Sequence, residues 1–154
     1  MGLREQISDA LKEAMKAKAA RRVSTLRLVL AALKDRDIAN RTEESRAGVG
    51  DDEILLLLAK MVKQREESAA IYDSGGRPEL ARAEREEIVI IQEFLPKQMS
   101  EAEVETAAKA VIAEIGATSM KDMGKVIGAL KERYAGQMDF AKTSGLVKAL
   151  LTAR

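Results

Sequence analysis

Apolar residues recur at steps of three and four positions along nearly the whole chain, and no segment alternates convincingly between apolar and polar residues. Such spacing places the apolar side chains on one face of a helix and predicts seven helices, so we expect an all-α fold. Read alone, the segment 88–91 also fits a buried strand, but its helix-forming flanks and the lack of a partner strand favour a helix. The apolar positions on the expected faces are Leu3, Ile7, Leu11 and Met15; Val23, Leu26, Val29, Leu30 and Leu33; Ile54, Leu58, Met61, Val62, Ile71 and Tyr72; Ile88, Val89, Ile90 and Ile91; Val104, Ala108, Val111, Ile112 and Ile115; and Phe140, Leu146, Val147, Leu150 and Leu151.

Residues that cap or break helices mark the expected helix ends. Asp51 or Asp52 is expected to cap the third helix, because a side-chain oxygen there accepts hydrogen bonds from first-turn amides. The segment 73–78 is expected to end that helix, and Pro78 suits the first turn of the next one. The last three helices are delimited by two capping boxes, two glycine stops and one further cap: Ser100–Glu103, Ser119–Asp122, Gly116, Gly136 and Asp139.

Pro96 is the expected domain boundary, because proline ends a helix and here stands between two helical patterns. Residues 1–96 are expected to form an N-terminal domain of four helices, and residues 97–154 a small C-terminal domain of three. A loop rich in Thr, Ser, Glu and Gly is expected at 40–50, and the linker at 16–22 is expected to be helical in part.

The composition excludes several kinds of chemistry. The 154 residues include no His, Cys or Trp, which excludes an imidazole base, a thiol nucleophile, a disulfide and the His or Cys ligands of zinc sites. We predict no catalytic residue, no cofactor and no metal. The lack of cysteine fits a reducing compartment, and no apolar run is long enough to span a bilayer. The protein is therefore expected to be cytoplasmic, without a membrane partner.

Charge is segregated along a chain that is nearly neutral as a whole, with 26 Lys and Arg against 25 Asp and Glu. Residues 1–41 hold ten basic and five acidic residues, residues 42–93 seven and thirteen, residues 94–120 two and four, and residues 121–154 seven and three. Two basic surfaces able to meet phosphate are therefore expected. One basic surface belongs to residues 1–41 and is more simply explained as a solvated hinge. Its residues are Lys16, Lys18, Arg21, Arg22 and Arg27.

The segment 122–130 is the most distinctive one in the chain. Gly124 and Gly128 lie four positions apart and therefore share a helix face. Glycine in a helix interior costs about 1 kcal/mol relative to alanine, so two such glycines need a reason. Either a neighbouring helix crosses very closely there, or the backbone of a ligand approaches.

Several segments resemble those of the GatB/YqeY family, and the resemblance covers nearly the whole chain. The similar segments are Ser24–Leu28, Lys63–Ser68, Gly76–Arg77, Glu93–Ser100, Gly116–Ser119, Asp122–Leu130 and Leu146–Lys148. One departure concerns the Asp-Gly-Lys triplet that many family members carry before the last helix. Here the order is Asp-Phe-Ala-Lys, so Lys142 stands one place later and no Gly follows Asp139.

The resemblance implies a non-catalytic helical module like the tail of GatB, a subunit of the tRNA-dependent amidotransferase, where the tail contacts tRNA. Lys and Arg meet RNA phosphates, so the expected partner is tRNA or a tRNA-linked amidotransferase or translation complex, and not DNA. The residues expected to contact RNA are Lys121, Gly124, Lys125, Gly128, Lys131, Arg133, Lys142 and Lys148. The alternative is that the lysines solvate a helical surface and the glycines serve helix packing.

Two other functions remain open at this point. A protein-interaction adaptor without RNA would dock a basic partner on the acidic middle of the chain. A carbon–nitrogen ligase activity with glutamine as the amide donor follows from the family label alone, because the chain lacks the Gly/Ser-rich segment of an amidase site. Base-specific reading of single strands is not expected, because two Tyr and two Phe are too few for a stacking platform.

Overall fold

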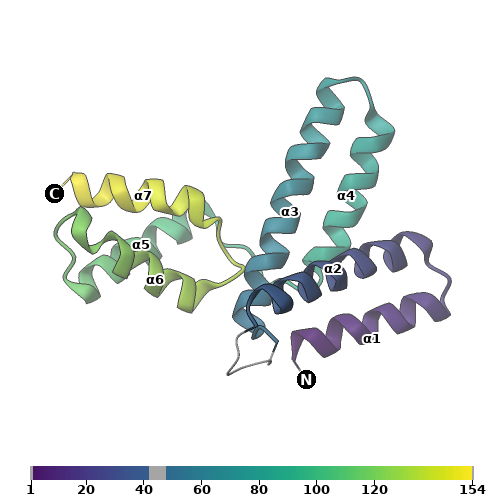
Figure 1. The fold of residues 1–154 in the computed structure, drawn as a ribbon. Coiled ribbons are helices and arrows are strands. Elements are labelled where there is room, and N and C mark those ends of the chain that lie inside the picture. Colours follow the sequence, from purple (N-terminus) through teal and green to yellow (C-terminus); the bar gives the residue numbers. More distant parts are fainter. Residues whose placement is uncertain (1, 42–47, 154) are drawn as a thin grey trace. The chain divides into compact units, whose positions relative to one another are not determined.

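A computed structural model describes residues 2–41 and 48–153. Over these ranges the chain is helical without a strand, which confirms the predicted all-α fold (Figure 1). The predicted loop at 40–50 lies partly outside the described residues, at 42–47. The elements in chain order are α1 (Leu3–Lys16), α2 (Ala20–Ala39), α3 (Asp51–Ser74), α4 (Pro78–Gln92), α5 (Glu101–Ile115), the short 3₁₀-helix η1 (Met120–Asp122), α6 (Met123–Tyr134) and α7 (Phe140–Thr152).

The chain divides into two compact units, Met1–Leu95 and Pro96–Arg154. The N-terminal unit contains α1 to α4, and the C-terminal unit contains α5, η1, α6 and α7. Each unit encloses a hydrophobic core of its own, as expected for separately packed domains.

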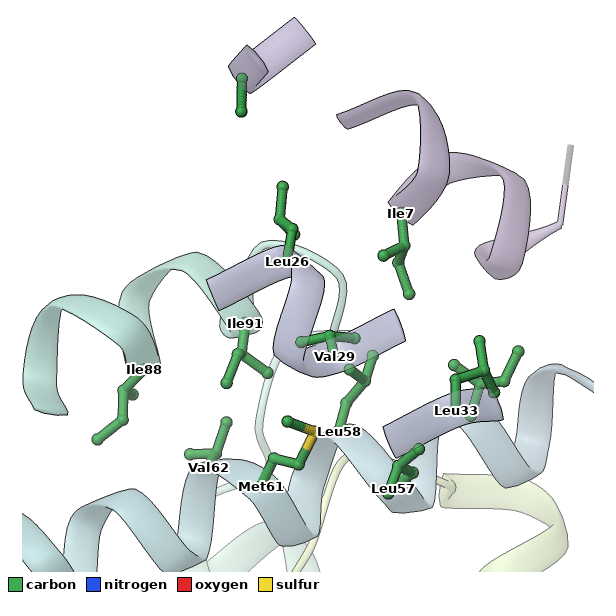
Figure 2. Packing of buried hydrophobic residues seen from close by; sticks show 12 residues of the cluster. Ile7, Leu26, Val29, Leu33, Leu57, Leu58, Met61, Val62, Ile88 and Ile91 are labelled. Atoms are coloured by element: carbon green, nitrogen blue, oxygen red, sulfur yellow. The ribbon is translucent and has the colours of Figure 1, made fainter. Parts of the chain in front are cut away.

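The N-terminal unit consists of two helical hairpins. α1 and α2 form the first, α3 and α4 form the second, and α2 packs against both helices of the second hairpin (Figure 1). Figure 2 shows side chains of α4 directed toward α3 in the core. Burying a large aliphatic side chain contributes about 1.5–3 kcal/mol. The core residues are Ile7, Ala14, Leu26, Val29, Leu33, Ile54, Leu57, Leu58, Met61, Val62, Ile88 and Ile91.

Four apolar positions of the predicted faces are exposed in the structure. Met15 is 50% exposed because the buried line of α1 runs through Ile7 and Ala14, seven positions apart, which turns Met15 away from α2. Ile71 is 70% exposed near the end of α3, in the half of the α3–α4 hairpin that reaches beyond α2 (Figure 1). Val89 is 64% exposed near the end of α4, on the side of that helix away from the buried Ile88 and Ile91. Ile115, at the end of α5, is 37% exposed. The outer half of this hairpin is closed mainly by small residues, since Ala69 and Ala81 are the buried residues there.

The predicted cap of α3 is wrong in detail. Gly50 occupies the cap position, and Asp51 and Asp52 lie in the first turn, where a carboxylate still interacts favourably with the helix dipole. The Asp51 carboxylate instead accepts a hydrogen bond from the backbone N–H of Leu3, 3.2 Å away, and so caps α1. A sequence pattern does not reveal that Asp51 caps α1, because Asp51 and Leu3 are 48 positions apart.

The helix ends predicted in the C-terminal unit are confirmed. Both capping boxes form, although the one at Ser119 opens η1 and only then leads into α6. Asp139 caps α7 by accepting a hydrogen bond from the Ala141 N–H at 2.9 Å. Gly116 and Gly136 adopt φ values of +73° and +76°, the left-handed conformation that glycine accommodates without strain.

The C-terminal unit is a small three-helix bundle in which α6 packs against both α5 and α7. A backbone hydrogen bond of 2.9 Å from the Met99 N–H to the Gln137 carbonyl joins the segment before α5 to the turn before α7. The buried residues of the bundle are Ala107, Ala108, Val111, Ile112, Ala117, Val126, Leu130, Met138, Val147 and Leu151.

Candidate nucleic-acid interface

One side of η1 and α6 carries most of the predicted RNA contacts. Val126 and Leu130 are fully buried and fix the orientation of α6 in the bundle. The positions on the other side of the helix are exposed, and helical spacing gathers them on one face. We call this surface the glycine face; its residues are Lys121, Gly124, Lys125, Gly128 and Lys131.

The glycines of this face do not serve packing within the chain. A Cβ atom added at Gly124 or Gly128 would meet nothing within 4 Å. Of the two alternatives for these glycines, a closely crossing helix is therefore not found among the described residues. Gly124 lies in the first turn of α6, where a glycine is tolerated more easily, but Gly128 lies in the helix interior. Gly128 thus costs the helix about 1 kcal/mol without a structural gain in this chain.

Gly145 in α7 is a third residue of this kind, which the predicted RNA contacts do not include. It is exposed, and an added Cβ would again meet nothing within 4 Å. Lys142 and Lys148 lie three positions before and after it. The sequence does contain a signal that could have identified Gly145: a glycine inside a helical pattern, with a lysine on either side at helical spacing.

The lysines of the glycine face are free to bind an anion. Among the described residues, the structure shows no salt bridge to Lys121, Lys125 or Lys131. The ammonium of Lys131 lies 6.0 Å from the centroid of the Phe140 ring on α7, which holds the lysine loosely over an aromatic face. These cations are consequently available to a ligand without the loss of an internal ion pair.

The start of η1 is held in place by a carboxylate. Asp122 accepts hydrogen bonds from the backbone N–H groups of Thr118 at 3.0 Å and Ser119 at 3.4 Å. The hydrogen bond from Thr118 is the main reason why the pKa of Asp122 lies below its usual value, and the positive charge of Lys125 adds to the effect. Asp122 therefore stays ionised and fixes the backbone from which Lys121 and Lys125 project.

Arg133 does not belong to the glycine face. Its guanidinium forms a 2.5 Å ion pair with Glu114 of α5, on the side of α6 that faces α5. The hydrogen bond that Arg133 donates to Glu114 is the main reason why the pKa of Arg133 is raised. Arg133 thus joins two helices of the bundle.

Lys142 is also set apart from the other lysines. It lines a groove of about 430 Å³ between the beginnings of α5 and α7, whose floor is apolar. Three carboxylates line the same groove, so the local charge is unfavourable for phosphate; they belong to Glu101, Glu105 and Asp139.

Several arginines of the N-terminal unit have internal partners. Arg21 of α2 pairs with Glu86 at 3.3 Å and lies 4.0 Å from Glu87, and Arg65 of α3 binds Glu87 at 2.9 Å. Further pairs join Arg22 to Glu93, Arg36 to Glu53 and Arg85 to Asp73. Three arginines of the basic first segment, Arg21, Arg22 and Arg36, thus pair with acids of the acidic second segment on other helices. The interpretation of Arg21 and Arg22 as a solvated hinge is accordingly incomplete, since both belong to α2 and pair with α4.

The described part of the chain contains no group of His, Cys, Asp and Glu side chains arranged to hold a metal ion. Within that same part, no helix is long and apolar enough to cross a membrane.

Comparison with known proteins extends over both units. A family model described as Yqey-like protein matches residues 4–151. The chain is also 28% identical over 138 residues to Altered inheritance of mitochondria protein 41, mitochondrial, from Meyerozyma guilliermondii. That alignment covers 86% of this chain and 70% of the other protein. The range matched by the family model includes every residue of the glycine face.

Proposed function

Because the chain belongs to the Yqey-like protein family, we propose that its C-terminal unit binds RNA, with tRNA as the partner, through the glycine face. The proposed contact also includes Gly145 and Lys148 of α7, which are both exposed. The resemblance to the tRNA-contacting tail of GatB supports tRNA as the ligand, and a tRNA-linked amidotransferase or translation complex as its setting.

The observation that carries the proposal is the combination of open glycines and unpaired lysines. Gly128 and Gly145 weaken their helices, and a Cβ atom added at either position would meet nothing within 4 Å. Without Cβ atoms, the helix backbone can approach a sugar–phosphate chain more closely than any other sequence would allow. The lysines beside the glycines then reach phosphate oxygens on either side of the contact.

The chemistry favours RNA of defined shape over base-specific reading. Duplex RNA is recognised mainly through its backbone and 2′-hydroxyl groups, and lysines supply point charges for phosphates. The surface carries no exposed Tyr or Phe at its centre among the described residues. Binding through Lys121, Lys125, Lys131 and Lys148 would therefore be strongly salt-dependent and tolerant of sequence.

The test is the affinity of the full chain for total tRNA across a salt series from roughly 50 to 200 mM, the range over which phosphate contacts weaken steeply. The double variant Lys121→Ala, Lys125→Ala should reduce the slope of log K against log salt by about one to two units. Lys109→Ala is the matched control, because Lys109 lies on α5 in an ion pair with Glu105. Absence of binding at low salt, or an unchanged slope in the double variant, would overturn the proposal.

The glycines allow a second test that separates stability from binding. Gly128→Ala and Gly145→Ala should each raise the free energy of unfolding by up to about 1 kcal/mol, because alanine favours the helix and meets no neighbour. If the glycines serve RNA contact, the same variants should weaken tRNA binding. Higher stability with unchanged affinity would assign the glycines no part in binding.

The other two functions make distinct predictions. An adaptor should still recover a protein partner by affinity capture after RNase treatment, without measurable affinity for tRNA. A carbon–nitrogen ligase should transfer the amide of glutamine when the chain is assayed alone. We expect neither outcome.

A further inference from the structure

The groove between the beginnings of α5 and α7 is a second candidate site, which the RNA proposal does not use. Its volume is about 430 Å³, within the range of small-molecule sites, roughly 300–1,000 Å³. All of its lining residues belong to the C-terminal unit, and none of them belongs to the glycine face. A ligand in the groove would contact α5 on one side and α7 on the other.

Four apolar side chains form the floor of the groove. Met138 is buried in the core of the C-terminal unit, and the other three are partly buried and pack against the same core. Methionine side chains are flexible and adapt to what lies on them, so the floor can accommodate an aliphatic chain. The four residues are Met99, Val104, Met138 and Leu146.

Two of the four charged residues that line the groove already have a role in the fold. Glu105 pairs with Lys109, one turn further along α5, at 3.0 Å. Asp139 caps α7 by accepting a hydrogen bond from the Ala141 N–H at 2.9 Å. These interactions offset much of the charge of both carboxylates, since Lys109 is a cation and the start of α7 is the positive end of a helix dipole.

The other two charged residues, Glu101 and Lys142, carry charges of opposite sign. Both are exposed, and neither forms an ion pair among the described residues. Glu101 is the first residue of α5, and Lys142 lies in the first turn of α7. Glu101 is not needed to cap α5, because Ser100 and Glu103 form the capping box there. The groove therefore offers one available carboxylate on one helix and one available ammonium on the other.

We propose that the groove binds a small zwitterion that carries an ammonium and a carboxylate at the two ends of an aliphatic chain, as in an ω-amino acid. The ligand's ammonium binds Glu101, its carboxylate binds Lys142, and its aliphatic chain lies on the apolar floor. A ligand with a single charge would satisfy only one of the two residues. Because the groove shares no residue with the glycine face, this inference stands independently of RNA binding.

The test is NMR of the full chain with isotope-labelled methionine methyl groups, titrated with γ-aminobutyrate and with ε-aminocaproate, which differ in the spacing of their charges. Met99 and Met138 report on the groove, and Met15 in α1 is the internal reference. We expect saturable shifts of the Met99 and Met138 signals, without a shift of the Met15 signal. The absence of a saturable shift with either compound would overturn the proposal.

The requirement for both charges is tested with ligands that carry only one. Hexylammonium and hexanoate match the chain length of ε-aminocaproate, and each should bind about threefold more weakly, because it lacks one partly exposed ion pair. Equal binding of either compound would show that the groove does not select a zwitterion. Shifts of the Met99 and Met138 signals with protein concentration alone would assign the groove to a second copy of this chain and would also overturn the proposal.

Two variants assign the charged ends of the ligand. Glu101→Gln should weaken the binding of ε-aminocaproate and of hexylammonium by about threefold but not that of hexanoate. Lys142→Gln should weaken ε-aminocaproate and hexanoate but not hexylammonium. Glu132→Gln is the matched control, since Glu132 is exposed on α6 and does not line the groove. Unchanged affinity in both groove variants, or equal weakening by the control, would contradict the assignment.

Discussion

Arg4 of α1 and Asp37 of α2 form a two-bond ion pair that also holds the segment leading into α3. The Arg4 guanidinium binds the two Asp37 carboxylate oxygens at 2.6 and 3.0 Å. It donates a further hydrogen bond to the Val49 carbonyl at 3.0 Å, while the Val49 N–H binds Asp37 at 2.9 Å. The pair thus joins the first hairpin to the entry of the second.

Asp37→Asn should lower the free energy of unfolding by about 1–2 kcal/mol, because the guanidinium loses its charged partner. The hydrogen bond from Arg4 holds the pKa of Asp37 below its usual value. A carboxylate of this kind contributes stability above its unfolded-state pKa of about 4, and this contribution is lost as the pH falls through the lower, folded-state pKa.

Urea unfolding at a series of pH values measures this effect. The difference between the natural chain and Asp37→Asn should be largest near neutral pH and should narrow in acid. Asp9→Asn is the control, since Asp9 is exposed on α1 and has no ion pair among the described residues. A difference that stays constant down to low pH would contradict the prediction.

Gly48→Ala should weaken the same contact. A Cβ atom at this position would collide with the Arg4 guanidinium and lie 3.0 Å from an Asp37 carboxylate oxygen. The guanidinium would have to move away from Asp37, at a cost of about 1 kcal/mol. The natural chain provides the comparison in urea unfolding. An unchanged unfolding midpoint for Gly48→Ala would show that Arg4 adjusts freely.

Lys18→Gly should stabilise the N-terminal unit by up to about 1 kcal/mol. Lys18 lies in the turn between α1 and α2 with a φ of +56°, a conformation that is unfavourable for a residue with a Cβ atom. Lys16→Gly is the opposite control, because Lys16 lies in the last turn of α1 with a helical backbone. Thermal denaturation followed by circular dichroism should show the first variant melting higher and the second lower.

Ser100→Ala should destabilise the C-terminal unit by about 1 kcal/mol. The Ser100 hydroxyl accepts a hydrogen bond from the Glu103 N–H at 3.1 Å, and the Glu103 carboxylate accepts one from the Ser100 N–H at 3.0 Å. Without the hydroxyl, a first-turn donor of α5 loses its partner. Thr106→Ala, also on α5, removes a hydroxyl that binds only a helix carbonyl, and calorimetry should show little change for it.

Local features of this protein followed from its sequence with few errors. The helix ends at Gly116, Gly136 and Asp139 depend on residues within one turn, so a pattern of neighbours was sufficient to predict them. The membership of Gly124 and Gly128 in one face follows from helical spacing in the same way. All the residues that determine these features lie within a few positions of one another in the chain.

The tertiary structure decided which charges remain available and which apolar residues are buried. In the sequence, Arg21 and Arg133 count as basic residues like any others, but in the structure both have acidic partners on other helices. Lys142 shares a groove with carboxylates from the beginnings of α5 and α7, and a Cβ atom added at Gly128 would meet nothing within 4 Å. The sequence determines how many charged residues the chain has. Only the packing of helices that are distant in sequence determines which cations have acidic partners and which remain available to a ligand.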